Sequence, residues 1–488
     1  MHQAFKNSES AIACVWVDEF NTQVHALAAE QSLERCASYQ AQHQTFIKAR
    51  VQKITQAEQS TIKRKAHIVR CDDVTAATGL PSLQEQYFAR VQATLMTQHQ
   101  AHHTVDEQTG KRVSFGVVRV ANIPPCAALA NYLLHAPWPE HISPKIMCYH
   151  SQQVLLLRSH QEHHLDEVLK RKEQAGDAPK AFGHKVIREH LDNTPDTVSE
   201  VIFILVATPV EEVGRDHDFD WAVIEPSSYR SIIQLAGRVR RHRNMGVTTP
   251  NIGIMQYNLK GLRREDQAVF CRPGYEQDNL RLNQHNMDGL VDEAQLNHAV
   301  NAIPRIEQPT ALDPHNRLVD LEHQAIANSL TRYTQKGPAA LQAWLVESWW
   351  LTGLPQAINR FRDSAPDVSL YRVWQNELAI FAEKDERGKF LKDNVGNLAP
   401  CGWQFNISER EPLGEEGKKR LWLPRDYKTV LQAHYHPEGH QNLSTEEQQT
   451  QLRRTSQRYG EITVPNPQKD REQKFEYSDD FGLVVKRS

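Results

Sequence analysis

The residues with the clearest chemical potential lie between positions 206 and 243. This stretch ends in the pattern Q-x-x-G-R-x-x-R, formed by Gln234, Gly237, Arg238 and Arg241. Arginine is always charged, and its planar fork of N–H donors fits phosphate oxygens. In a helix, Arg238 and Arg241 share one face because they are three residues apart. The pattern predicts a site that stabilises a triphosphate whose γ-phosphoryl group is being transferred.

A second pattern, T-x5-G-x-D, stands upstream and comprises Thr208, Gly214 and Asp216. Thr208 follows the apolar run EVIFILVA, so we expect it at the carboxyl end of a parallel strand, where open α/β sheets bind ligands. Gly214 permits a backbone turn against a phosphate or a ribose, and Asp216 is a candidate acceptor for ribose hydroxyls. This short pattern is weak alone, but it gains weight from the apolar run WAVIEP between it and Gln234.

Polar residues follow two further apolar runs. GVVRVANIPP carries Arg119 and Asn122 ahead of a helix that Pro124 and Pro125 would start. KIMCYHS ends in His150 and Ser151. Polar residues at successive strand ends predict a track for a sugar–phosphate backbone. Ordinary turn and capping roles for the same residues remain an open alternative.

The elements that must position these residues alternate between short apolar runs and helical segments. Runs that are apolar on both faces are typical of a parallel sheet covered by helices on both sides, built from right-handed βαβ units. We therefore predict an α/β domain over residues 111–270. Residues 1–110 are mostly polar and helical in pattern, 271–335 read as a mainly helical linker, and 336–488 as a mixed α+β domain. No internal repeat is expected.

Composition narrows the class of protein. The 488 residues are 39% hydrophobic and 24% charged, with a net charge of −3, which is typical of an ordinary soluble protein of two to four domains. The charge excludes a surface coated in basic residues, so any nucleic acid must be held in a local groove. The sequence shows no run of about 18 apolar residues, no secretory signal and no C-x-x-C pair. These features predict a cytoplasmic protein with reduced cysteines and no membrane contact.

The strand ends R-V-A-N and C-Y-H-S, the stretch V-A-T-P-V-E-E-V-G-R-D-H-D-F-D and the run Q-L-A-G-R-V-R-R-H-R resemble motifs IV to VI of superfamily 2 helicases. The form W-A-V-I-E-P-S-S-Y-R-S-I-I-Q is similar to the CRISPR-associated helicase-nuclease of type I-F interference. The runs V-W-V-D-E-F, C-R-P-G-Y-E, L-V-D-L-E-H and Y-S-D-D-F-G-L extend that similarity from end to end. The resemblance implies a RecA-like fold, ATP and Mg²⁺ as cofactors, and single-stranded DNA and the type I-F surveillance complex as partners.

The resemblance also implies roles. Arg238 and Arg241 would contact the ATP phosphates, with Arg241 as the arginine finger. Gly214 and Asp216 would line the nucleotide cleft, while Gln234 and Gly237 would set the helix there. The residues that would touch the DNA backbone are Arg119, Asn122, His150, Ser151 and Thr208. Residues 1–110 would be the tail of a first RecA-like lobe with a helical insertion, 111–270 the second lobe, and 336–488 a domain that closes over the single strand.

Other parts of such an enzyme are not found in this sequence. The Gly-Lys pairs at 110–111, 388–389 and 417–418 lack the following Ser or Thr of a Walker A loop. Asp18-Glu19 has the local form of a Walker B box, but too few residues precede it to form a phosphate loop and helix. Asp292-Glu293 follows no apolar strand. The single His-Asp pair, His217-Asp218, lies inside the nucleotide motif, so it is not the paired His-Asp metal site of a nuclease. The cluster His434, His436 and His440 has no acidic or cysteine partner, and no metal site is expected.

The leading hypothesis is the C-terminal portion of a type I-F helicase-nuclease. ATP turnover would then require a first lobe, which is separately encoded if the enzyme is split. The alternative is a non-enzymatic module that binds single-stranded DNA or assists assembly of the antiviral complex.

Overall fold

A computed structural model describes residues 15–17, 24–26, 33–76, 81–174, 176–263, 268–331, 353–358, 367–435, 444–466 and 471–486. The Walker B candidate Asp18-Glu19 and two of the clustered histidines, His436 and His440, lie outside these ranges. Two short strands, β1 (Val15–Val17) and β2 (Val24–Ala26), pair with each other. Within the described ranges, no helix is long and apolar enough to cross a membrane.

The centre of the molecule is a seven-stranded sheet with the order β3-β9-β8-β5-β7-β6, to which β4 adds beside β5. Its strands are β3 (Ala66–Val69), β4 (Thr104–Val105), β5 (Arg112–Arg119), β6 (Ile142–Tyr149), β7 (Glu200–Ala207), β8 (Trp221–Ile224) and β9 (Ile252–Met255). All pairs are parallel except β4 with β5. The predicted α/β class is confirmed.

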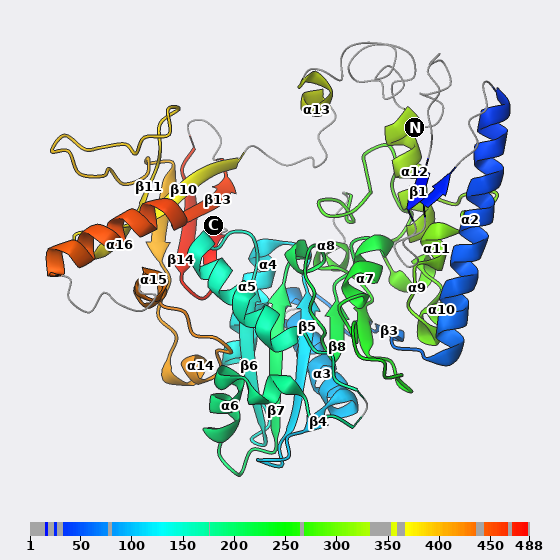
Figure 1. The fold of residues 1–488 in the computed structure, drawn as a ribbon, viewed down its shortest axis with the longest axis horizontal. Helices are drawn as coiled ribbons and strands as arrows, with labels where there is room; N and C mark the ends of the chain where they lie inside the picture. The colour runs from blue at the N-terminus through cyan, green and yellow to red at the C-terminus, as the bar shows by residue number, and fades with distance from the viewer. Residues whose placement is uncertain are drawn as a thin grey trace.

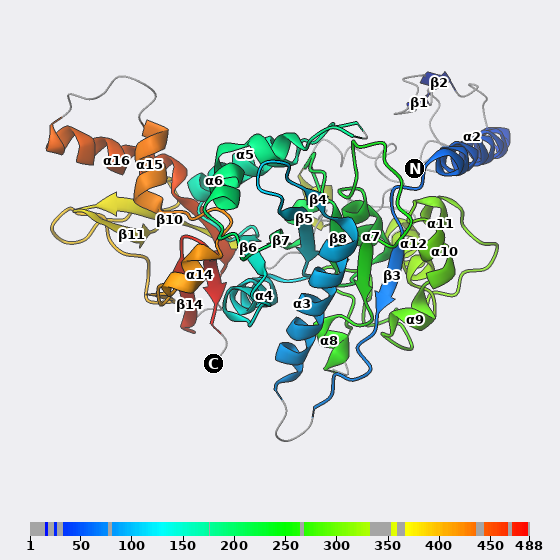
Figure 2. The same ribbon diagram turned by 90° about the horizontal axis from the view of Figure 1, so that it is seen from below.

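Helices cover both faces of this sheet (Figure 2). One face carries α3 (Leu83–His102) and α4 (Ile123–His135), and the other carries α5 (Leu155–Leu169), α6 (Lys185–Asp192) and α7 (Tyr229–Ala236). Side chains of β7 alternate between the two faces: Ile202 and Ile204 pack on the α3 side, and Phe203 and Leu205 on the α7 side. This alternation explains why β7 is buried along its whole length.

The sheet begins earlier in the chain than predicted. β3 pairs in parallel with β9, and α3 packs on β5 and β8, so a large part of residues 1–110 belongs to the same layered domain. The many polar residues of this segment hide its place in the domain, because α3 buries polar side chains that form hydrogen bonds inside the protein. His99 Nδ1 lies 2.7 Å from Ser114 Oγ, and His102 Nε2 lies 3.0 Å from the Pro250 carbonyl oxygen. Among the described elements, β1, β2 and the long α2 (Leu33–Ser60) precede this part.

The predicted linker is also packed rather than merely connecting. It contains α9 (Met287–Leu290), α10 (Glu293–His298), α11 (Ile303–Ile306) and α12 (Leu318–Thr331), which follow the one-turn α8 (Leu259–Leu262). These helices lie beside the β3 edge of the sheet (Figure 1). Met287, Leu296 and Leu321 join the main core, so this segment extends the layered domain.

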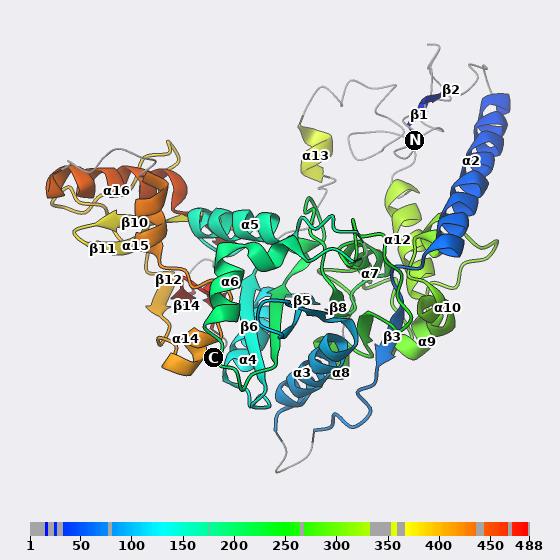
Figure 3. The ribbon, with the colours of Figure 1, turned by 60° about the horizontal axis from the view of Figure 1, so that its bottom comes forward.

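The C-terminal region is mixed α+β, as predicted. One antiparallel sheet holds β10 (Asp367–Gln375), β11 (Leu378–Ala382) and β13 (Glu461–Pro465), and a second sheet holds β12 (Phe405–Glu409), β14 (Gln473–Ser478) and β15 (Gly482–Val485). Its helices are α14 (Glu415–Lys419), α15 (Tyr427–Tyr435) and α16 (Thr445–Tyr459), and α13 (Leu354–Ile358) precedes them. The region lies beside the β6 edge of the central sheet (Figure 3).

A strap between α14 and α15, residues 420–425, joins this region to the central sheet. The Ile146 amide donates to the Arg420 carbonyl oxygen at 2.7 Å, and the Trp422 amide donates to the Ile146 carbonyl oxygen at 2.9 Å. The Trp422 side chain is fully buried against Phe115 and Phe203. The strap therefore caps the β6 edge and completes the core of a domain whose other strands lie far away in the sequence.

The segment after β11 has a local regularity. Two consecutive turns follow β11, centred on KDERGK and KDNVGN. In each turn an aspartate, Asp385 or Asp393, accepts two backbone amides through Oδ1. A glycine with positive φ, Gly388 or Gly396, completes each turn. Two units with an eight-residue period are too short for a composition scan to reveal.

Candidate functional site

The predicted site residues fall into two groups that approach each other at Glu212, which bonds to Arg119 of one group and Arg238 of the other. Five lie at the carboxyl ends of β5, β6 and β7: Arg119, Asn122, His150, Ser151 and Thr208. The loop after Thr208 then runs to the amino end of β8, where Phe219 bridges to Val239. Asp216, Arg238 and Arg241 therefore belong to the amino end of β8, which we call the arginine end.

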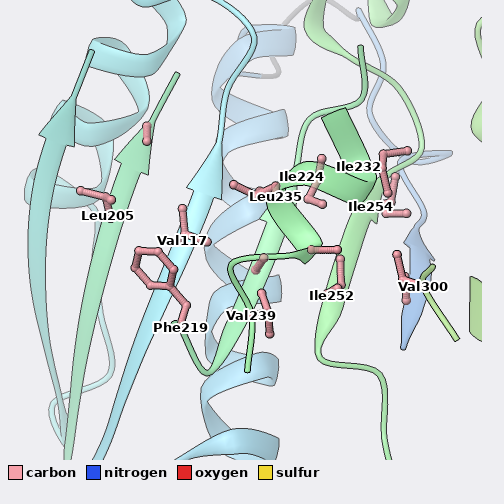
Figure 4. Packing of buried hydrophobic residues seen from close by; sticks show 14 of the residues in the cluster. Val117, Leu205, Phe219, Ile224, Ile232, Leu235, Val239, Ile252, Ile254 and Val300 are labelled. Carbon is pink, nitrogen blue, oxygen red and sulfur yellow. The ribbon is translucent and has the colours of Figure 1, made fainter. Parts of the chain in front are cut away.

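The helix α7 positions the arginine end. The Ser228 side chain caps it by accepting from the Ser231 amide at 3.0 Å. Ile232 and Leu235 pack on the sheet beside Ile224 and Ile254 (Figure 4). Gln234 is half-buried on the same helix.

The helix ends at Ala236, and Gly237 is its C-cap. Arg238 and Arg241 therefore do not share a helical face, contrary to the sequence prediction. They stand in an irregular loop in which Arg240 has a φ of 46°. Because the helix stops at Gly237, the three-residue spacing of a helix does not apply to Arg238 and Arg241.

Arg238 is buried and bound to backbone. Its Nε donates to the Glu211 carbonyl oxygen at 3.3 Å and its Nη2 to the Glu212 carbonyl oxygen at 2.8 Å. Burial lowers the pKa of Arg238, and the neighbouring Arg241 lowers it further. Arg238 thus fastens its loop to the short 3-10 turn Pro209–Glu211 that follows Thr208.

Arg241 is the accessible arginine, with 38% of its side chain exposed. Its Nε donates to Asp216 Oδ1 at 2.7 Å, and His242 Nε2 lies 3.0 Å from the same oxygen. Partial burial acts to raise the pKa of Asp216, but Arg241 and His242 outweigh it and hold that pKa below its usual range. Gly214 is exposed with a φ of 73°. The structure thus brings Asp216 and Arg241 together, with Asp216 orienting the guanidinium.

Arg243, the last arginine of this stretch, is neutralised by carboxylates of the protein itself. Its guanidinium contacts Asp218 Oδ1 and Asp220 Oδ1, both at 2.7 Å, and Arg171 shares Asp220 at 2.9 Å. Burial acts to raise the pKa of Asp220, but Arg171 and Arg243 hold it at about 2. The charge of Arg243 is therefore compensated by carboxylates of the protein and needs no phosphate. The missed signal is the alternation in H-D-F-D, which places two carboxylates ahead of β8.

At the carboxyl end, Arg119 is not available to DNA. Its side chain is 0% exposed, and its Nε donates to Glu212 Oε1 at 2.8 Å. Its Nη1 donates to the Glu225 carbonyl oxygen at 2.7 Å, and its Nη2 to Ser227 Oγ at 2.6 Å. The DNA role assigned to Arg119 is therefore corrected to a structural one, because the ends of neighbouring strands use all of its donor groups.

His150 is also occupied. It is fully buried, its Nε2 lies 2.7 Å from the Phe481 carbonyl oxygen, and its Nδ1 accepts from the Gln152 amide at 3.1 Å. The pattern requires a neutral ring with the proton on Nε2. His150 therefore ties β6 to the C-terminal region instead of contacting DNA.

Three of the predicted backbone-contacting residues differ in exposure. Ser151 is exposed and Asn122 is half-buried, and Asn122 Nδ2 donates to the Arg272 carbonyl oxygen at 2.9 Å. Thr208 is buried, and its amide donates to the Tyr149 carbonyl oxygen at 3.1 Å. Asn122 and Ser151 are thus the two that remain at the surface.

A cavity of about 370 Å³ lies at this end, between the start of α4, α8 and the strands β14 and β15. Asn122 lines it together with four cationic side chains that the sequence did not single out: Lys260, Arg263, Arg410 and Lys486. Arg410 stacks over the Phe481 ring at 4.3 Å, and Lys486 pairs with Glu476 at 2.7 Å. Because distant segments supply these cations, no local motif could have marked them.

The cavity wall is pinned by Glu225. Its Oε2 accepts from the Ala121 amide at 2.6 Å and its Oε1 from the Leu259 amide at 2.9 Å. This carboxylate thus joins the ends of β5 and β9. In the part of the chain that is described, no group of three or more His, Cys, Asp or Glu side chains is arranged to hold a metal ion.

Comparison with known proteins gives a consistent result. A family profile described as the CRISPR-associated nuclease/helicase Cas3, C-terminal, matches residues 112–244. The chain is 33% identical over 468 residues to the CRISPR-associated nuclease/helicase Cas3 subtype I-F/YPEST of Pseudomonas aeruginosa (strain UCBPP-PA14), covering 95% of this chain and 40% of the relative. It is also 33% identical over 470 residues to the protein of the same description from Pectobacterium atrosepticum (strain SCRI 1043), covering 94% of this chain and 39% of the relative.

The chain thus spans about two fifths of the length of these relatives. Among solved structures, T. fusca Cas3-AMPPNP aligns with 97% of this chain and 46% of its own, at 12% identity and a TM-score of 0.35. That score is low, so the fold rests on the strands and helices of the chain itself. By sequence, 94–95% of the chain is similar to Cas3 nuclease/helicases of subtype I-F, and residues 112–244 match the profile described as the C-terminal part of that family.

Proposed function

We propose that this chain supplies the second RecA-like lobe and the C-terminal domain of an ATP-dependent DNA helicase or translocase of type I-F CRISPR interference. The observation that carries the proposal is the arginine end, where Arg241 is held by Asp216 yet remains accessible. Arg238 lies beside it. The names of the relatives, nuclease/helicase Cas3 of subtype I-F, support the same assignment.

The residues at the arginine end fit the terminal phosphoryl group of ATP. Asp216 engages Arg241 through Nε, which leaves the two terminal guanidinium nitrogens to fork onto phosphate oxygens. A guanidinium there stabilises the charge that develops during phosphoryl transfer. The phosphate loop and the Mg²⁺ ligands would come from a first lobe, because the sequence contains no Walker A pattern.

The cavity at the carboxyl end is the proposed path of single-stranded DNA. Its cations come from both the central sheet domain and the C-terminal region, so a strand lying there would be held between the two. Asn122 and Ser151 are the predicted residues that keep surface positions for this role. The further partners we propose are the type I-F surveillance complex and a separately encoded first lobe, in the cytoplasm.

A phosphate-release assay tests the ATP part of the proposal. We expect the purified chain alone to show no DNA-stimulated turnover, and a mixture with a separately produced first lobe to show it. Arg241→Ala should abolish the restored turnover. DNA-stimulated turnover by the chain alone, abolished by Arg241→Ala, would contradict the need for a first lobe.

Fluorescence anisotropy with a labelled oligothymidine tests the DNA part. We expect the double substitution Arg410→Gln and Lys486→Gln to weaken binding and to reduce the slope of log K against log salt by about 0.7 for each lost phosphate contact. Lys418→Gln, an exposed lysine on α14 paired with Glu415, is the matched control. Equal losses in the control and in the double variant would remove the cavity from the DNA path.

The missing Walker A pattern favours a second candidate, a non-enzymatic module that binds single-stranded DNA. This candidate predicts DNA binding that neither a non-hydrolysable ATP analogue nor Arg241→Ala alters, with or without the first lobe. A change in DNA affinity on adding the analogue to the reconstituted pair would exclude it.

A further inference from the structure

Arg64, in the segment that leads into β3, also belongs to the arginine end. Its Nε donates to the Val239 carbonyl oxygen at 2.8 Å, inside the loop that carries Arg238 and Arg241. The amide of Val300 donates to the Arg64 carbonyl oxygen at 3.0 Å and fixes the backbone at that point. Arg64 stands outside the Q-x-x-G-R-x-x-R pattern and reaches it only because β3 joins the sheet.

Arg64 and Arg238, like Arg240, are bound differently from Arg241 and Arg243. Within the described ranges, both donate to backbone carbonyl oxygens, and no ion pair joins either of them to a carboxylate. The nearby carboxylates are already engaged: Asp216 by Arg241, and Asp218 and Asp220 by Arg243. A carbonyl oxygen solvates a guanidinium without neutralising it, so positive charge accumulates here.

The electrostatic consequences agree with these contacts. Burial is the largest effect that holds the pKa of Arg64 at about 10; Asp218 opposes it, and Arg241 and Arg238 lower the pKa further. The pKa of Arg243, by contrast, is raised by Asp220 and Asp218 despite burial. Arg241 and Arg238 therefore add positive charge beside Arg64, and an anion bound among the three would relieve their repulsion.

We propose that Arg64 is a third cation of the phosphate site and binds the terminal phosphoryl oxygens of a nucleoside triphosphate together with Arg238 and Arg241. This inference rests on the proposed function and names a residue for the same site. Its bond to Val239 uses only Nε, so two terminal nitrogens are left for the ligand. Three converging cations favour a longer and more highly charged phosphate chain, so the site should prefer tripolyphosphate to pyrophosphate, and pyrophosphate to phosphate.

Isothermal titration calorimetry of the 488-residue chain with inorganic tripolyphosphate tests this inference. A hydrogen bond to a charged group contributes about 1.5–3 kcal/mol, so Arg64→Gln should weaken tripolyphosphate binding roughly tenfold or more. Arg64→Lys keeps the charge but loses the fork, and we expect a loss of about threefold. Lys65→Gln removes a neighbouring cation that donates instead to the Thr248 carbonyl oxygen, so it is the matched control and should bind like the wild type.

Each outcome has a distinct meaning. Wild-type affinity in Arg64→Gln, alongside weakened binding in Arg238→Gln, would overturn the role of Arg64 and leave the proposed function standing. Equal losses in Arg64→Lys and Arg64→Gln would show that Arg64 only holds Val239, which also overturns the inference. If near-ultraviolet circular dichroism shows Arg64→Gln to be misfolded, unchanged affinity in Arg64→Lys overturns it. Failure of the wild type to bind tripolyphosphate would count against the whole phosphate site.

Discussion

The arginine end and the carboxyl end of the central sheet use the same residue types for different purposes. At the carboxyl end, Arg119 is fully buried, and each of its donor groups meets an acceptor of the protein. At the arginine end, Arg241 is exposed and shares a single carboxylate with His242. The difference teaches that a polar residue at a strand end is a site candidate only where the fold leaves its donors unused.

The carboxyl end is closed by segments that arrive late in the chain. Phe481 accepts from His150, and the strap with Trp422 caps β6. At the arginine end, Arg241 keeps 38% of its side chain exposed, and Arg64 and Arg238 donate to backbone carbonyl oxygens. Stability should therefore depend on the buried polar residues Arg119 and His150 of the first end, and binding of a nucleoside triphosphate on the arginines of the second.

The largest effect on stability is expected from Arg119→Ala. The substitution leaves Glu212 as a buried charge without its partner, and the Glu225 carbonyl and Ser227 lose a donor. Breaking a buried ion pair in this way costs about 3–5 kcal/mol of the free energy of unfolding. Urea denaturation followed by far-ultraviolet circular dichroism measures it. A loss of less than about 1 kcal/mol in the free energy of unfolding would show that Arg119 behaves like an accessible arginine. The proposed difference between the two ends would then be wrong.

Trp422→Ala should come next, with a loss of about 3–4 kcal/mol typical of truncating a buried aromatic side chain. The indole packs on Phe115 and Phe203 in the core of the central sheet, so the whole sheet should become less stable, not only the strap. Thermal unfolding followed by far-ultraviolet circular dichroism, which reports on the backbone, measures the loss of stability. Trp403→Ala, at a side chain that is 63% exposed, is the control and should unfold like the wild type.

A smaller, pH-dependent effect is expected from Asp220. Its folded pKa of about 2 lies below the ordinary value of about 3.9, so the folded state binds fewer protons there. The resulting stabilisation is complete above about pH 4 and is lost as the pH falls towards 2. Its size is on the order of 2–3 kcal/mol. Unfolding free energies measured from about pH 5 down to about pH 2 should fall accordingly. A flat profile would show that Arg171 and Arg243 do not hold Asp220 ionised.

The sequence predicts the sheet better than it predicts the site. Apolar runs such as EVIFILVA identify buried parallel strands because both of their faces must be covered. β3 is missed because AHIV is short and α3 buries His99 and Gln98 on a polar-looking face. Local patterns find Asp216 and Arg241, which the fold does bring together.

The rest depends on contacts between distant segments. Arg119 is buried against Glu212, and His150 against the Phe481 carbonyl oxygen. The cavity is lined by cations from separate segments, among them Lys260, Arg410 and Lys486. None of these pairs has a spacing that a single sequence reveals. The helical face predicted for Arg238 and Arg241 fails for a local reason, because the helix ends at Ala236 and Gly237 caps it.

The smallest effect on stability, and the sharpest test of the comparison, is Asp216→Asn. The ion pair with Arg241 is close to half-exposed, so its removal should change the free energy of unfolding by less than about 1 kcal/mol. The same change frees the guanidinium from its orienting carboxylate and removes a negative charge beside the phosphate site. Affinity for inorganic tripolyphosphate should therefore rise, while turnover of ATP with a reconstituted first lobe should fall because Arg241 is no longer held in place. Unchanged affinity and turnover would mean that Asp216 and Arg241 form only a surface pair, and the arginine end would then differ from the carboxyl end in exposure alone.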